Sequence, residues 1–100
     1  MGIRVASGVK IFGAATSQNP FHVVRHVAAG RTYHVRFRFE CLLMPGTYFV
    51  NVGVKGSVGG TPKFLHRVQD ALAFRVPASE ASVSNGFVDA KIVPTLIAED

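Results

Sequence analysis

The chain has 100 residues, 48% of them apolar and 17% charged, a composition typical of one globular domain spanning residues 1–100 and not of a disordered chain. Eleven Lys and Arg against six Asp and Glu give a net charge of +5 and a pI near 10.0. The basic residues are dispersed along the chain without a run, so we do not expect nucleic acid as a partner. No apolar stretch reaches the roughly 18 residues that cross a bilayer, and the N-terminus lacks a secretory signal pattern.

The N-terminal third predicts short, irregular β-structure. Ile3–Phe12 has Gly8 in its middle, so it forms either two short strands around a turn or one bulged strand. Gly13–Pro20 has the composition of a loop. Phe21–Val27 is apolar but repeatedly interrupted by polar residues, and we interpret it as an irregular edge segment that leads to a turn before Arg31.

The alternation is strongest between Arg31 and Lys55. On Arg31–Leu43, every second side chain is apolar: Tyr33, Val35, Phe37, Phe39 and Cys41. Because a strand sends successive side chains to opposite faces, this apolar face is expected in the core, with Phe37 and Phe39 buried and Cys41 a small buried hydrophobe. Turn residues at Met44–Gly46 then join this strand to a second one at Thr47–Lys55, which predicts a β-hairpin. On this model, Phe37→Ala would remove about 3–5 kcal/mol of stability.

The rest of the chain continues in the same way. Gly56–Pro62 is interpreted as a flexible loop, and Lys63–Asp70 is ambiguous, with room for one helical turn. A strand is expected at Ala71–Val76, followed by a polar connection and a last strand at Gly86–Val93. Short strands separated by Gly and Pro predict an all-β antiparallel sandwich.

A sandwich usually has more strands than the five or six predicted here. The first strand also begins almost at Met1, as though its hairpin neighbour were missing, and an open sheet edge invites pairing with another chain. We therefore predict a homodimer whose interface includes either Ile3–Phe12 or the C-terminal segment Gly86–Ile97.

The sequence offers no catalytic constellation. The four histidines, His22, His26, His34 and His66, lack the additional ligands that a metal site needs, and no nucleophile elbow, phosphate loop or dinucleotide motif is present. We therefore expect a protein that is not an enzyme and that uses no cofactor and no metal.

A binding surface is the remaining class of site, and the polar face of the predicted hairpin is the candidate. The five side chains expected on it are His34, Arg36, Arg38, Phe49 and Asn51. Planar polar donors make paired contacts with neighbouring sugar hydroxyls, while an aromatic ring packs against the apolar side of a sugar. An ordinary solvated sheet face is the alternative interpretation, and the absence of Trp weakens the case for sugar.

Four segments together resemble a known family. They are GVKIFGAAT (8–16), AAGRTYHVRFRFECLLMPGTYFVNVGV (28–54), FLHRVQDALAFRV (64–76) and GFVDAKIV (86–93). The family is the C-terminal carbohydrate-binding domain of the ATP-binding subunit of O-antigen polysaccharide ABC transporters, the Wzt C-terminal domain family. The most specific element is the Leu-Met-Pro-Gly-Thr-Tyr turn at Leu43–Tyr48, taken together with Asp70–Val76.

The resemblance implies an immunoglobulin-like β-sandwich that binds a lipid-linked polysaccharide for export. It also implies a homodimer with strand exchange, a transmembrane permease and an ATPase domain as partners, and a cytoplasmic location peripheral to the inner membrane through the transporter. Compared with the family pattern, one or two N-terminal strands and the ATPase domain are expected to be absent from residues 1–100. The alternative function is a structural or docking β-sandwich that holds subunits together without recognising a glycan.

Overall fold

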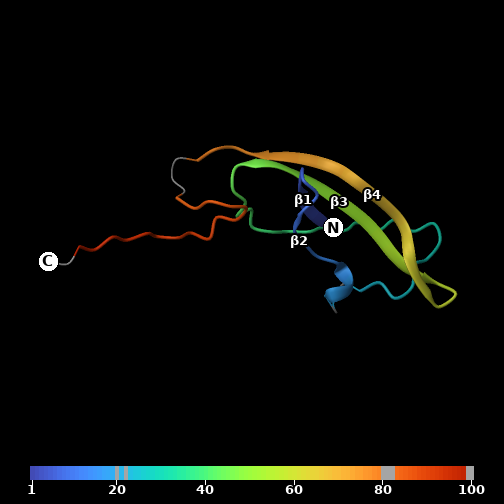
Figure 1. The fold of residues 1–100 in the computed structure, drawn as a ribbon. Coiled ribbons are helices and arrows are strands. Elements are labelled where there is room, and N and C mark those ends of the chain that lie inside the picture. Colours follow the sequence, from blue (N-terminus) through green and yellow to red (C-terminus); the bar gives the residue numbers. More distant parts are fainter. Residues whose placement is uncertain (20, 22, 80–82, 99–100) are drawn as a thin grey trace.

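The computed structural model describes residues 1–19, 21, 23–79 and 83–98. Four antiparallel strands form one sheet in the order β2-β1-β3-β4, and a single 3-10 turn, η1 (Thr16–Gln18), follows β2 (Figure 1). The described residues contain no α-helix. The predicted all-β class is confirmed, and the sheet is consistent with one layer of a β-sandwich.

The N-terminal segment forms a small hairpin. β1 (Gly2–Val5) and β2 (Lys10–Gly13) pair antiparallel around a turn in which Gly8 has a φ of 92°, a value that favours glycine. The two-strand alternative for Ile3–Phe12 is therefore confirmed. β1 also pairs with β3, so it lies inside the sheet and the expected open edge at Ile3 is wrong.

A long hairpin dominates the sheet. β3 (Gly46–Val58) and β4 (Thr61–Val76) are joined by Gly59 and Gly60 alone, with φ values of 61° and 82°. Two positive φ values are typical of the tight turns whose twist matches that of the paired strands. The strands predicted at Thr47–Lys55 and Ala71–Val76 are confirmed. The flexible loop predicted at Gly56–Pro62 is wrong, because most of it is strand, and the ambiguous segment Lys63–Asp70 is extended.

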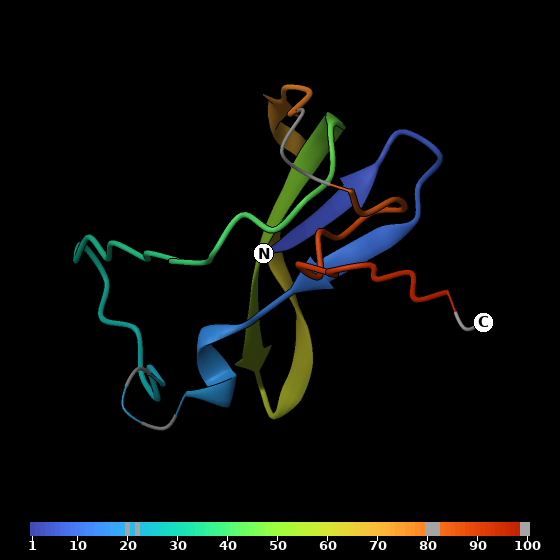
Figure 2. The same cartoon turned by 90° about the vertical axis from the view of Figure 1, so that its left-hand side faces the viewer.

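The strand predicted at Arg31–Leu43 is wrong. Residues 31–42 have no regular secondary structure, and only Leu43 forms an isolated bridge, with Val88. The physical reason is that β1 pairs with Tyr48–Asn51 of β3 at the edge where this strand would begin its pairing, while β4 occupies the other edge. Figure 2 shows residues 24–38 looping away from the sheet.

The last predicted strand is also wrong. Gly86–Val93 forms no strand. The Leu43–Val88 bridge and two backbone hydrogen bonds join it to residues 42–44. The Met44 N–H donates to the Phe87 carbonyl (2.9 Å), and the Asp89 N–H donates to the Leu42 carbonyl (2.5 Å). Beyond this point the chain runs away from the sheet (Figure 1). Of the earlier interpretations, Pro20, His22 and residues 80–82 lie outside the described residues.

The core is small and lies on one face of the sheet. Its buried members are Ile3, Leu43 and Tyr48, with a rim of partly buried side chains that includes Phe12, Val50 and Phe74. The expected burial of the 31–43 face is wrong: Phe39 is 45% exposed, Cys41 is exposed, and Phe37 is only partly buried. Phe39 instead packs edge-on against Phe12, with ring centres 5.3 Å apart.

Tyr48 gives the core a measurable pH dependence. Its hydroxyl donates to the Met44 carbonyl (2.5 Å). Burial, and after it the negative charge of the nearby Cys41 thiolate, raises the pKa of Tyr48 above its ordinary value of 10.0. The unfolded chain therefore loses this proton at lower pH than the folded chain does, and stability falls as the pH rises above 10. In urea unfolding at pH 9 and pH 11, the midpoint should fall further for the native chain than for Tyr48→Phe. Equal falls would contradict the assignment.

Candidate functional site

The face of the sheet opposite the core carries the polar side chains. Along β3 the side chains of Tyr48 and Val50 belong to the core face, so Phe49 and Asn51 project from the other face. Arg4 on β1 lies directly across from Phe49 in the register, and joins it on this face. Alternation on two adjacent strands is therefore sufficient to bring a ring, an amide and a guanidinium together.

These residues and one from β4 form a connected cluster. The Arg4 guanidinium lies 4.6 Å from the centre of the Phe49 ring, a favourable cation–π geometry. Arg4 also donates to Asp70 Oδ1 from Nε (3.1 Å) and Nη2 (2.5 Å). The backbone N–H of Asp70 in turn donates to Asn51 Oδ1 (2.8 Å). One cation is thus held at a fixed position over a ring.

A bulge in β4 places the carboxylate. Val50 pairs with Leu72 and Val52 pairs with Val68, so three residues of β4 stand opposite Asn51 alone. The middle one, Asp70, has a φ of 54°, a left-handed conformation that is uncommon for residues other than glycine. The Asn51 side chain binds the exposed N–H of this bulge, and Asp70 can then reach across β3 to Arg4.

A second ring lies farther along the same face. Phe64 on β4 pairs with Lys55 on β3; the Lys55 Nζ lies 4.7 Å from its ring centre and the Arg67 guanidinium lies 4.9 Å from it. Gly53 leaves room for this ring, since a Cβ there would come within 3.2 Å of it. Phe64 remains 47% exposed. We call Arg4, Phe49, Lys55, Phe64 and Arg67 the cation–aromatic strip.

The structure brings together two of the five predicted site residues. Phe49 and Asn51 share one face of β3, as expected. His34, Arg36 and Arg38 are exposed on the loop of residues 31–42, because the strand that was to align them does not form. In the described part of the chain, no hydrogen bond, ion pair or ring contact joins these three to Phe49 or Asn51. Their part in ligand binding stays a prediction.

The sequence interpretation missed Arg4, Phe64, Arg67 and Asp70. A signal for Phe64 was present: a two-residue Gly59-Gly60 loop fixes the register of the flanking strands, and counting back from it pairs Lys55 with Phe64. Arg67 and Asp70 lie beyond register shifts that the sequence does not mark.

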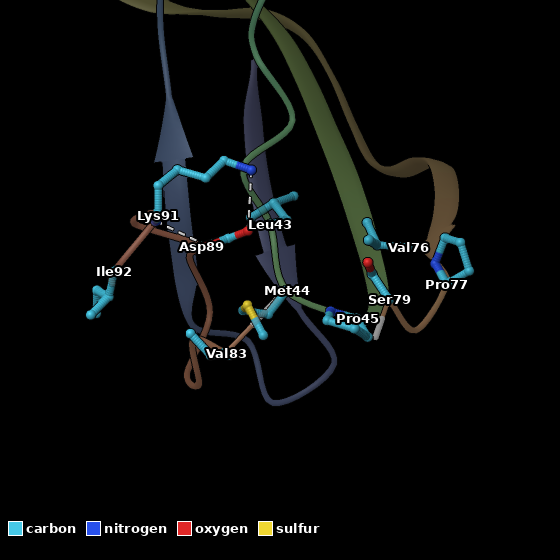
Figure 3. A pocket seen from close by; sticks show the side chains of 10 residues that line it. All are labelled: Leu43, Met44, Pro45, Val76, Pro77, Ser79, Val83, Asp89, Lys91 and Ile92. Atoms are coloured by element: carbon cyan, nitrogen blue, oxygen red, sulfur yellow. Dashed lines mark hydrogen bonds and ion pairs between the residues drawn. The ribbon is translucent and has the colours of Figure 1, made fainter. Parts of the chain in front are cut away.

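A shallow pocket at the other end of the molecule is a weaker candidate. It has a volume of about 410 Å³ and lies between the Leu43–Pro45 turn, the end of β4 and the segment around Asp89 (Figure 3). Its carboxylate is already engaged: hydrogen bonds from the Lys91 N–H and the Ser84 hydroxyl, together with the Lys91 amine at 3.2 Å, lower the pKa of Asp89. An ionised carboxylate that is bonded in this way supports the loop rather than acid–base chemistry.

Across residues 1–19, 21, 23–79 and 83–98, no three His, Cys, Asp or Glu side chains come together as metal ligands. Within the same described ranges, no helix has the length and apolar character needed to cross a membrane.

An all-β domain with a solvent-facing strip of rings and cations has the surface of a binding module. The family model of the Wzt C-terminal domain matches residues 1–90 of the sequence, and the chain belongs to this family. The resemblance of the sequence to that family is thereby confirmed. Comparison with curated proteins and with solved structures gave no match.

Proposed function

We propose that this chain is a non-catalytic glycan-binding domain that recognises a lipid-linked, O-antigen-type polysaccharide for export by an ABC transporter. The observation that carries the proposal is the cation–aromatic strip, which offers one half-exposed ring, Phe64, and one partly buried ring, Phe49, with hydrogen-bond donors beside each. Rings pack against the apolar faces of sugars, and guanidinium and amide groups bind neighbouring oxygens. Membership of the Wzt C-terminal domain family supports the same function.

The partners follow from this function. The polysaccharide is the ligand, and the permease and the ATPase domain of the same transporter are the protein partners, which gives a cytoplasmic location peripheral to the inner membrane. In this proposal Phe49 of the strip and the neighbouring Asn51 amide contact the polysaccharide. His34, Arg36 and Arg38 contact it from the loop of residues 31–42.

Isothermal titration with the surface polysaccharide of the organism that encodes the chain tests this function. We expect a saturable heat of binding. In a parallel NMR titration, we expect amide chemical-shift changes concentrated in β3 and β4. A titration without heat and without shift changes would contradict glycan recognition.

The second candidate function is assembly without glycan recognition. It is supported by apolar side chains near the C-terminus: Val93, Leu96 and Ile97 are 84%, 96% and 79% exposed, and their segment extends away from the sheet. Exchange of this segment between two copies would bury these side chains. In the alternative interface Ile3–Phe12, β1 has both edges paired, and only β2 lies at the edge of the sheet.

We place the proposed homodimer at Gly86–Ile97, because of these exposed apolar side chains, in preference to the alternative interface Ile3–Phe12. In sedimentation at micromolar concentration, the native chain should give a dimer, and Leu96→Asp with Ile97→Asp should give a monomer near 10.7 kDa. A native chain that sediments as a monomer would contradict the dimer. Loss of the dimer with unchanged polysaccharide binding would separate the two functions.

A further inference from the structure

The four strands carry a strongly unequal set of charges. Six of the eleven Lys and Arg lie on them, but only one of the six Asp and Glu, Asp70. Most of these cations lie on the face of the strip. Arg4, Lys55 and Arg67 belong to the strip itself, Arg75 pairs with Thr47 on the same face, and the Lys10 side chain crosses it above Gly2.

The one carboxylate that the four strands carry already has a partner. Asp70 pairs with Arg4. In the described part of the chain, Lys55 and Arg67 have no carboxylate within ion-pair distance, and the contact recorded for each is with the Phe64 ring. The Phe64 end of the strip is therefore an uncompensated positive site beside a half-exposed ring.

The length of the strip sets the size of its ligand. Phe49 and Lys55 are six positions apart on β3, which corresponds to about 20 Å in an extended strand. A ligand that touches both rings is an oligosaccharide rather than one sugar. Such a ligand lies along one face of one hairpin, because both rings are on that face.

We propose that the glycan bound by the strip is negatively charged. Its carboxylate or phosphate groups pair with Lys55 and Arg67, and its sugar rings pack against Phe49 and Phe64. This inference rests on the proposed glycan-binding function and names the class of its substrate. Two cations beside one ring attract an anion, whereas a neutral glycan would leave both without a counter-charge in the bound state.

The experiment compares three forms of the surface polysaccharide of the encoding organism. One is native, one has its carboxyl groups reduced to alcohols, and one has its phosphate esters removed. The native form should bind, and the treatment that removes its charge should weaken binding about tenfold. Lys55→Gln with Arg67→Gln should cause a similar loss with the native form and almost none with the uncharged form.

The matched control is Arg25→Gln with Lys63→Gln. It removes the same charge, but Lys63 pairs with Gly56 on the opposite face of the hairpin and Arg25 lies outside the sheet. This control should bind the native glycan like the unmodified chain, and circular dichroism should show both double variants folded.

Several outcomes would overturn the inference. Both treated polysaccharides binding as tightly as the native form would show that charge is irrelevant, while leaving the glycan-binding function intact. Equal losses of glycan binding in the two double variants would show that binding depends on the net charge of the chain and not on Lys55 and Arg67. Single-stranded DNA of similar charge binding as tightly as the glycan would point to a general polyanion site. Failure of every polysaccharide form to bind would overturn the glycan-binding function itself, and this inference with it.

Discussion

Ile3→Ala is expected to lower the free energy of unfolding by about 2–5 kcal/mol, the range for truncating a buried aliphatic side chain. Ile3 has no exposed surface, and it lies on a strand paired on both sides, opposite Phe12 in β2 and Val50 in β3. With Leu43 and Tyr48 it makes up the buried core. For a domain of ordinary stability, about 5–15 kcal/mol, this loss is a large fraction of the total.

Guanidinium unfolding followed by circular dichroism measures this effect, as a lower midpoint with an unchanged slope. Val27→Ala is the control, because it shortens an aliphatic side chain that is 63% exposed and lies outside the sheet, and it should change stability by less than about 0.5 kcal/mol. Equal midpoints for the two variants would mean that the core does not lie on β1.

The sequence predicted the strands at Thr47–Lys55 and Ala71–Val76 correctly, but it did not predict which segments pair with them. Alternation on Thr47–Lys55 and on Arg31–Leu43 is a local property, and it is equally compatible with a hairpin between these two segments or with one between β3 and β4. The residues at the two turns explain why the β3–β4 hairpin forms instead of the other. Gly59 and Gly60 adopt the two positive φ values of a tight hairpin, whereas Pro45 has no N–H and Gly46 alone has a positive φ there, 156°.

The candidate site likewise contains residues that the sequence places correctly and residues that it does not. Phe49 and Asn51 follow from alternation within β3 alone, so the sequence was sufficient to place them on one face. The pairing of Arg4 with Asp70 joins residues 66 positions apart, and depends on a left-handed residue inside a bulge. Neither register shift in β4 has a Gly or Pro to mark it, so residues beyond them could not be assigned to a face from the sequence.

Phe64→Ala is expected to raise the Kd for the polysaccharide about 30-fold, equivalent to about 2 kcal/mol, while leaving the fold intact. An aromatic residue that packs against a ligand commonly has an effect of this size, because its truncation removes apolar contact with the ligand. Here it would also release Lys55 and Arg67, which are both held against the ring. Since Phe64 is half-exposed, stability should fall by only about 1 kcal/mol.

Leu65→Ala is the control for this variant, and the two should be compared by isothermal titration with the same polysaccharide. Leu65 is the next residue of β4 and is 51% exposed, close to the 47% of Phe64, but it packs near Gly56 on the opposite face of the hairpin. The two changes therefore disturb the same strand to a similar extent and differ in the face they alter. Leu65→Ala should bind like the native chain, and equal losses in both variants would move the glycan site away from the cation–aromatic strip.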